Sequence, residues 1–417
     1  MTDITTKLPE MKSGDKLIAA LAVMPQYDEN ICGQNHAVRL MALSDLYQIY
    51  VPSQMSLEIY SKLYLALLRS IQKKSTKLAI KQRYENYKAI QQNSYGGILG
   101  GSDSFTIIGT SGIGKSTAIS RAISLITENQ IIEMGELSTR IIPCLIVQCP
   151  FDSSVKGLLL EILRKVDETL DSRYYPYALK ARATTDMLIG SVSQVALNHI
   201  GMLIVDEIQN VVNSKNGKSK NGKSLIGALT QLINNSGISI CMVGTPESTV
   251  FFESAMQLAR RSVGLQYTAM SYNEYFQNFC KIIFRYQFLK NYTEISPAIM
   301  EWLYEHSAGV ISVVVALIHD AQEIAILTGK EVLDIGTLNE AYQQRLSLLH
   351  SYIEPPIVQK KTITKRKKAV AKIESQTDNN VDLESYSISA IAEKAKAESL
   401  DVVDLLKKVC NVIEVAV

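Results

Sequence analysis

The stretch FTIIGTSGIGKSTAIS, residues 105–120, decides the fold because it joins an apolar run, a glycine-rich loop and a helical pattern. Residues 105–109 are apolar and strand-like, and residues 117–126 are typical of a helix. Between them, GTSGIGKS at 109–116 fulfils the pattern G-x-x-x-x-G-K-[ST] in full. A strand that enters such a loop and a helix that leaves it are the setting of a phosphate-binding P-loop, which we therefore predict here.

Each residue type in this loop has a chemical reason. Glycines let the backbone curl so that its N–H groups point at phosphate oxygens, and the start of the helix adds the positive end of its dipole. Lys115 is expected to reach the β- and γ-phosphates, and the Ser116 hydroxyl to ligate Mg²⁺. The predicted contacts to the phosphates are Gly109, Thr110, Ser111, Gly112, Ile113, Gly114, Lys115, Ser116 and Thr117.

A second match to the same pattern, GKSKNGKS at 217–224, lacks this setting. No apolar strand precedes it, and it lies in a tandem repeat of N-G-K-S. Its own lysine and asparagine side chains leave little room for a phosphate. We interpret it as a basic surface loop.

Polar residues follow two later apolar runs. Asp206 and Glu207 follow MLIV at 202–205; Asp206 is predicted to hold Mg²⁺ together with Ser116, and Glu207 to be the base that orients the attacking water. The run at 238–245 ends in Thr245, which either hydrogen-bonds the γ-phosphate or the attacking water, or is an ordinary turn residue.

Two arginines end the helical pattern at 248–261. Arg260 or Arg261 either reaches the nucleotide of a neighbouring subunit, or both arginines simply favour the helix carboxyl end.

Strand and helix patterns alternate between residues 105 and 270, which predicts an α/β fold with a parallel sheet flanked by helices. Residues 53–92 are predicted as helix, and residues 272–350 as helical throughout. The expected strands are 105–109, 141–148, 202–207, 238–245 and 265–270, with helices at 156–170 and 224–236. The predicted parts are a mostly helical N-terminal extension (1–100), a P-loop α/β domain (101–270), a helical lid domain (271–352), a flexible basic linker (353–386) and a C-terminal helix (387–417).

The composition is that of an ordinary globular chain. The 417 residues are 47% hydrophobic and 20% charged, with a net charge of +2, which excludes a wholly disordered chain. The six cysteines are scattered, so we expect buried thiols in a reducing compartment rather than a disulfide scaffold. The apolar stretch at 307–318 is too short for a membrane span, and the polar start is not a signal peptide. The expected location is the cytoplasm.

Several segments together resemble the TnsC/TniB family of AAA+ ATPases, the regulators of DNA transposition. The resemblance extends over roughly residues 95–350. Besides the P-loop, it lies in VQCPFDSSVKGLLLEILRKVD (147–167), LIVDEIQNV (203–211), LTQLINNSGISICMVGTPE (229–247), LARRSVG (258–264) and LYEHSAGVISVVVALIHDAQEIAI (303–326).

The resemblance implies an AAA+ P-loop NTPase fold with ATP and Mg²⁺ as cofactors. It also implies that the chain binds double-stranded DNA, forms ring-like or helical homo-oligomers around it, and links a target selector of TnsD/TniQ type to transposase subunits of TnsA/TnsB type. It makes Thr245 the first sensor and Arg260 or Arg261 the arginine finger. Many AAA+ lids carry an arginine after a glycine, but residues 307–321 contain no Arg or Lys. We therefore expect slow ATP hydrolysis that serves as an assembly switch.

With so small a net charge, DNA binding must rely on a local basic strip and show little sequence preference. A solvated surface charge is the alternative for each member of the strip. The candidates are Lys156, Lys180, Arg182, Lys215, Lys218, Lys220 and Lys223. Two other functions stay open at this point, a helicase loader or replication initiator of AAA+ type and a P-loop kinase of small molecules.

Overall fold

The computed structural model describes residues 8–74, 76–92, 104–128, 130–134, 139–210, 220–249 and 264–346, all within the unit Met1–Ile357. The predicted basic linker (353–386) and C-terminal helix (387–417) lie outside these residues, as do Lys215, Lys218, Arg260 and Arg261.

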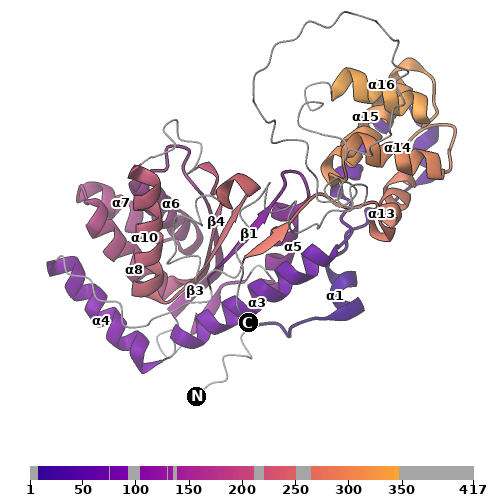
Figure 1. Ribbon diagram of the computed structural model, residues 1–417. Helices are drawn as coiled ribbons and strands as arrows, with labels where there is room; N and C mark the ends of the chain where they lie inside the picture. Colours follow the sequence, from indigo (N-terminus) through magenta and orange to yellow (C-terminus); the bar gives the residue numbers. More distant parts are fainter. Residues whose placement is uncertain are drawn as a thin grey trace, which may run out of the picture. The chain divides into compact units, whose positions relative to one another are not determined.

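A six-stranded sheet in the order β2-β3-β4-β5-β1-β6 forms the centre of the P-loop region (Figure 1). The strands are β1 (Phe105–Gly109), β2 (Ile132–Met134), β3 (Thr139–Gln148), β4 (Ile200–Asp206), β5 (Ser239–Gly244) and β6 (Leu265–Tyr267). All neighbours pair in parallel except β2, which is antiparallel to β3. The predicted α/β fold is confirmed. β2 was not predicted, because three residues are too few to show a strand period.

Alternating side chains of the strands build two separate cores. In β4, Leu203 and Val205 pack with α6 (Val155–Leu170), α8 (Thr185–His199) and α10 (Lys220–Ser236). Met202 and Ile204 point to the opposite face, where α1 (Gly14–Leu21), α3 (Gln54–Lys74) and α5 (Lys115–Thr127) cover the sheet. A parallel sheet covered on both faces explains why its strands read as continuous apolar runs.

The predicted single helix over residues 53–92 is wrong, since the chain forms α3 and then α4 (Lys77–Gln92) with a bend between them (Figure 1). Thr76 is the reason. Its hydroxyl donates to Lys73 O at 2.7 Å and accepts from Ala79 N at 3.3 Å, so it ends one helix and starts the next. Before the bend α3 packs against α5, and after it α4 packs against α8. Because α5 and α8 cover opposite faces of the sheet, the bend carries the chain from one face to the other.

Four helices form the predicted lid: α13 (Glu274–Phe284), α14 (Pro297–Ser307), α15 (Ile311–Thr328) and α16 (Ile335–Arg345). By length and composition α15 is apolar enough to cross a membrane, yet 56% of it is buried within the structure. Leu317, Ile318, Ala321 and Ala325 are fully buried in the core of the four helices. We therefore interpret α15 as the central helix of this core.

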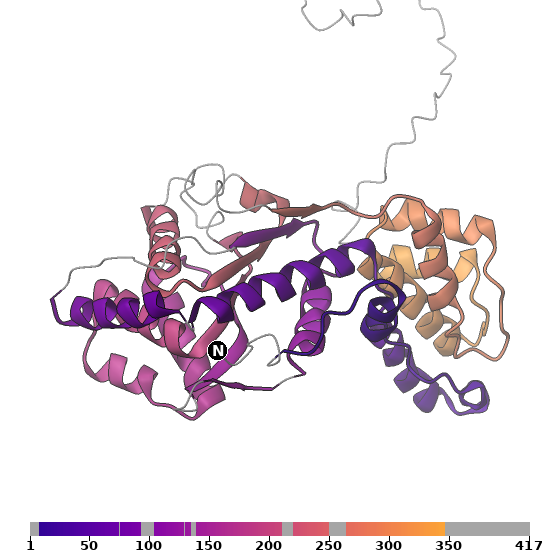
Figure 2. The same cartoon turned by 90° about the horizontal axis from the view of Figure 1, so that it is seen from below.

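Part of the N-terminal segment packs on these four helices rather than on the sheet. Leu43 and Leu46 share their core, and the Tyr27 hydroxyl donates to Gln287 O at 2.5 Å. Figure 2 shows this indigo segment beside the orange helices. The predicted domain boundaries stay predictions, but residues 27–49 and the lid share one hydrophobic core.

A buried ion pair joins the same two segments. The Arg39 guanidinium, fully buried in α2 (His36–Ala42), makes two hydrogen bonds to the Glu331 carboxylate at 2.6 and 2.8 Å. A third bond runs from Arg39 to Phe288 O at 3.3 Å. The hydrogen bonds from Arg39 lower the pKa of Glu331, and its partial burial opposes this.

Among the described residues, the cysteines form no disulfide bonds. Cys149, Cys241 and Cys280 are buried, as predicted, whereas Cys32 and Cys144 are half-buried. Burial raises the pKa of Cys149 and Cys280 to about 12, so these thiols stay protonated at neutral pH.

We expect Arg39→Met to lower the free energy of unfolding by about 3 kcal/mol, because it leaves the Glu331 carboxylate buried without its partner. Denaturant unfolding at pH 7 measures this, with Arg345→Met as the control, since the Arg345–Glu323 pair is exposed and worth well under about 1 kcal/mol. Equal losses in the two variants would contradict the prediction.

The contribution of the Arg39–Glu331 pair to stability should depend on pH, because the pKa of Glu331 is depressed in the folded chain. The contribution is present above the unfolded pKa near 4.5 and is lost as the pH falls through the folded pKa.

Candidate phosphate-binding site

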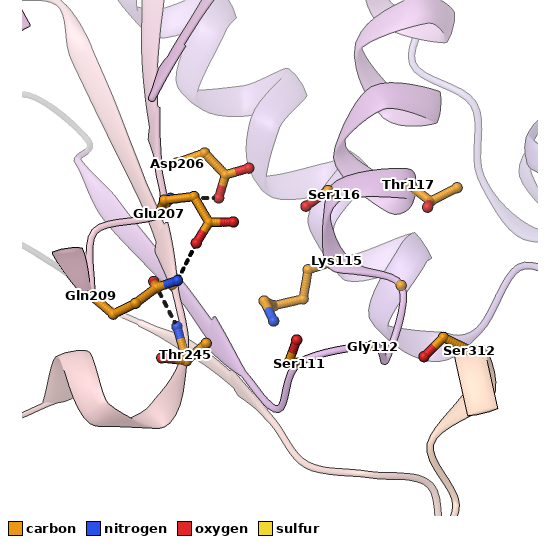
Figure 3. A pocket seen from close by; sticks show the side chains of 12 residues that line it. Ser111, Gly112, Lys115, Ser116, Thr117, Asp206, Glu207, Gln209, Thr245 and Ser312 are labelled. Carbon is orange, nitrogen blue, oxygen red and sulfur yellow. Dashed lines mark hydrogen bonds between the residues drawn. The ribbon is translucent and has the colours of Figure 1, made fainter. Parts of the chain in front are cut away.

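A cavity of about 280 Å³ lies where β1, β4 and β5 end (Figure 3). In parallel sheets the carboxyl ends of neighbouring strands form the usual ligand site. The residues that line it are Ser111, Gly112, Gly114, Lys115, Ser116, Thr117, Asp206, Glu207, Gln209, Gly244, Thr245 and Ser312. The structure thus brings most of the predicted phosphate contacts together with both acidic residues and the predicted sensor.

Two glycines give the loop its curl. Gly112 and Gly114 have φ angles of +80° and +94°, in the left-handed region that side chains disfavour. A Cβ on Gly112 would also lie 2.3 Å from Ser312 Oγ and 2.9 Å from Val310 Cγ1, whereas one on Gly114 would meet nothing within 4 Å. Gly112 is therefore required twice, by its conformation and by the close approach of the lid.

The Lys115 ammonium lies inside the curl of the loop. Its Nζ donates to the carbonyl oxygens of Gly109 at 2.7 Å and Thr110 at 2.9 Å. Partial burial lowers the pKa of Lys115, and the nearby carboxylates of Asp206 and Glu207 oppose that shift. The carbonyl oxygens that hold the Lys115 ammonium carry no net charge and do not neutralise it. Because the ammonium lies at the mouth of the cavity, its positive charge favours an anion as the ligand there.

The two carboxylates stand across the cavity from the loop. Asp206 ends β4, and one of its oxygens, Oδ1, accepts the Glu207 N–H at 2.8 Å. Glu207 follows with a φ of +57°, so the chain turns there. Glu207 is exposed and lies one residue beyond the end of β4, and its role as the base stays a prediction. A hydroxyl from Ser116 and the second oxygen of Asp206 are the hard donors that Mg²⁺ prefers, so the residues present fit this ion.

Gln209 is a cavity residue that the sequence analysis missed. Its amide lies between the predicted base and the predicted sensor. Nε2 donates to Glu207 Oε2, and Oε1 accepts the Thr245 N–H at 3.3 Å (Figure 3). The Thr245 hydroxyl in turn reaches Glu247 at 3.5 Å. The signal available in the sequence was the position of Gln209, two residues after Glu207 in the turn that leaves β4.

The lid meets the P-loop at the start of α15. Ser312 N donates to Gly112 O at 3.1 Å, and Ser312 lines the phosphate cavity. The described lid cations are Lys281, Arg285, Lys290, Lys330 and Arg345, and none of them lines this cavity. Within the described residues, the lid therefore offers the cavity a hydroxyl where many AAA+ proteins offer an arginine.

A second cavity, of about 260 Å³, adjoins the first and shares Gly112, Gly114, Thr117 and Ser312 with it. Its other walls are largely apolar and come from the N-terminal segment and the lid. They include Ile49, Tyr50, Val51, Met55, Met270, Tyr275, Phe279, Ile311 and Val315. The two cavities together have a polar end for phosphates and an apolar end that suits a flat ring.

The predicted DNA contacts come from separate helices. Lys156 is exposed in the first turn of α6, Lys180 is exposed at the end of α7 (Tyr174–Lys180), and Arg182 is exposed just beyond it. Asp167, near the end of α6, accepts the Tyr174 N–H at 2.9 Å, so α7 begins beside the end of α6 opposite Lys156. Lys220 and Lys223 lie in α10, but their side chains are not among those described.

We expect Gly114→Ala to lower the free energy of unfolding by about 1–2 kcal/mol, the cost of a left-handed alanine. Gly112→Ala should cost clearly more, because Ser312 and Val310 must also move aside. Denaturant unfolding without nucleotide compares the two variants. If both lost the same stability, the lid would not press on the loop at Gly112 as described.

Residues 101–268 match the family model described as Bacterial TniB protein, so this segment is similar to TniB proteins. The TniB family comprises transposition-associated ATPases with an AAA+ P-loop, so the match implies nucleotide binding. No curated protein matches the chain.

Proposed function

Taking the TniB-family segment as the premise, we propose that the chain is an ATP-dependent regulator of DNA transposition that assembles on double-stranded DNA. One observation carries the proposal: Lys115, Asp206, Glu207 and Thr245 face a single cavity within the matched segment. A P-loop lysine opposite two carboxylates and a polar strand end is the arrangement that ATP hydrolysis needs.

ATP would lie across both cavities. Its phosphates would take the polar one, where the P-loop N–H groups and Lys115 balance their charge. Its adenine would take the apolar one, between the N-terminal residues around Tyr50 and the lid around Phe279. Because the wall of that cavity belongs to the N-terminal segment and the lid, adenine binding would hold both against the P-loop.

Mg²⁺ would be held by the Ser116 hydroxyl and the Asp206 carboxylate, where it would neutralise charge on the β- and γ-phosphates. In the hydrolytic step, Glu207 accepts a proton from the attacking water as the water oxygen bonds the γ-phosphorus. The bond from that phosphorus to the β–γ bridging oxygen breaks, its electron pair stays with ADP, and the proton passes from Glu207 to solvent.

Hydrolysis by a single chain should be slow. None of the lid cations among the described residues lines either cavity. The charge that develops on the γ-phosphate and the ADP leaving group therefore lacks a stabilising arginine from the described lid residues. An arginine finger is worth roughly 10³–10⁵ in rate where it is used. Arg260 or Arg261 of a neighbouring copy would supply it, so that hydrolysis would depend on assembly.

DNA contact would come from exposed lysines and arginines, among them Lys156, Lys180 and Arg182. Lys156 lies on α6, Lys180 on α7 and Arg182 just after α7, and their charges would contact phosphates, which carry no sequence information. The proposed partners are a target selector of TnsD/TniQ type and transposase subunits of TnsA/TnsB type, which rest on the family alone.

We expect Lys115→Ala to abolish binding of a fluorescent ATP analogue and, with it, the assemblies seen by negative-stain microscopy with ATP analogue and duplex DNA. Lys281→Ala, at an exposed lid lysine on α13, is the control and should assemble normally. Assembly of the Lys115→Ala variant on DNA would refute the nucleotide switch. Monomers that transfer phosphate to a small molecule would instead support a kinase.

Salt dependence tests the DNA contacts. Each phosphate neutralised adds about 0.9 to the slope of log K against log salt, so Lys156→Ala should reduce the slope by about 1. Lys281→Ala should leave it unchanged. Fluorescence anisotropy with two unrelated duplexes measures both slopes, and an unaltered slope in the Lys156→Ala variant would remove Lys156 from the interface.

A further inference from the structure

We propose that Gln209 is a positioning residue for ATP hydrolysis, which holds the Glu207 carboxylate in one orientation and couples it to Thr245 at the tip of β5. The inference rests on the proposed ATPase function. It assigns to Gln209 no contact with the reacting atoms.

Both polar atoms of the Gln209 side-chain amide form hydrogen bonds. Nε2 donates to Glu207 Oε2, and Oε1 accepts the Thr245 N–H at 3.3 Å. The opposite orientation of the amide would set oxygen against the carboxylate and NH₂ against the N–H, so only one orientation satisfies both neighbours. The contact therefore fixes the direction of Gln209 as well as its place.

The chain around Gln209 is built to keep it there. Ile208 N donates to Val243 O at 3.0 Å, and the Asn210 side chain donates to Cys149 O at 3.0 Å, so the turn is tied to both strands beside β4. Gly244 leaves room for the amide, because a Cβ there would lie 3.0 Å from Gln209 Oε1. A rigid backbone and a matched space are what a positioning residue needs.

The carboxylate itself needs such support. Glu207 is exposed and follows the end of its strand in a left-handed conformation, so its own element does not fix the side chain. With Oε2 bound to Gln209, the other oxygen lies toward the open cavity and Lys115 (Figure 3). One oxygen is thereby anchored, and the second is left to take the proton of the attacking water.

The coupling follows from the second hydrogen bond. Thr245 is the predicted contact to the γ-phosphate, and its backbone N–H holds Gln209. A movement of Thr245 as the phosphate binds or leaves would shift the amide and, through it, the carboxylate. The base would thus be aligned when a triphosphate is present.

The first test uses Gln209→Met, which keeps the length of the side chain but removes both hydrogen bonds. Losing the hydrogen-bond partner of a metal ligand typically costs 10–100-fold in activity, and by analogy we expect kcat for ATP hydrolysis on duplex DNA to fall at least about tenfold when Glu207 loses its partner. Affinity for the ATP analogue and the melting temperature should stay near wild type. Gln344→Met, at an exposed glutamine on α16, is the matched control, and Glu207→Gln sets the level for complete loss of the base.

The second test uses Gln209→Glu and pH. Above the pKa of the new carboxyl group, two carboxylates oppose each other and kcat should be low; once protonated, the new group donates to Glu207 and accepts from Thr245 as the amide did. The described charged groups that face it are Lys115 on α5, Asp206 at the end of β4, Glu207 just after it, and Glu247 beyond Thr245. The ratio of kcat to wild type should therefore rise as the pH is lowered from 8 to 6, a change that a merely structural role would not produce.

The outcomes separate this inference from the function on which it rests. An unchanged kcat in Gln209→Met, or a flat ratio in Gln209→Glu, would overturn the role of Gln209 alone. Failure of the assembled wild-type chain to hydrolyse ATP would overturn the hydrolytic role of Glu207 and the inference with it. A loss of analogue binding in Gln209→Met equal to its loss of kcat would assign Gln209 to ligand binding and contradict positioning.

Discussion

The half-buried ammonium of Lys115 is the constraint around which the rest of the structure is arranged. It is held by two loop carbonyls, and that hold requires the left-handed glycines of the loop and the strand that leads into it. The same loop offers Gly112 O to the first turn of α15, so the lid approaches the site through the P-loop backbone. The phosphate cavity and the position of the lid are thus linked through one short segment, and the two carboxylates face that segment across the cavity.

Local patterns in the sequence predicted the parts of the fold that depend on neighbouring residues. Apolar runs gave β1, β3, β4 and β5, because a sheet covered on both faces leaves its strands no polar side. They did not give the bend at Thr76, since a threonine is tolerated within helices as well as between them. Nor did they give the Arg39–Glu331 pair, whose partners are 292 residues apart in the chain and meet only in the folded lid.

In the candidate site, too, the residues predicted were those with a local sequence signal, and the features missed depend on contacts between distant residues. The P-loop motif, Asp206, Glu207 and Thr245 were predicted because each follows a strand whose end is visible in the sequence. Gln209 was missed because its position two residues after Glu207 does not by itself show its hydrogen bonds to Glu207 and to Thr245, just beyond β5. The apolar cavity was missed for a similar reason, as its walls come from N-terminal residues and from lid helices far along the chain.

The central claim is that a bound triphosphate joins neighbouring copies of the chain on DNA. Electron cryomicroscopy of the full chain with duplex DNA and a non-hydrolysable ATP analogue tests it most directly. The account predicts an oligomer in which the γ-phosphate lies between Lys115 of one copy and Arg260 or Arg261 of the next. A triphosphate enclosed within one subunit, with no arginine of a neighbour near it, would contradict the account.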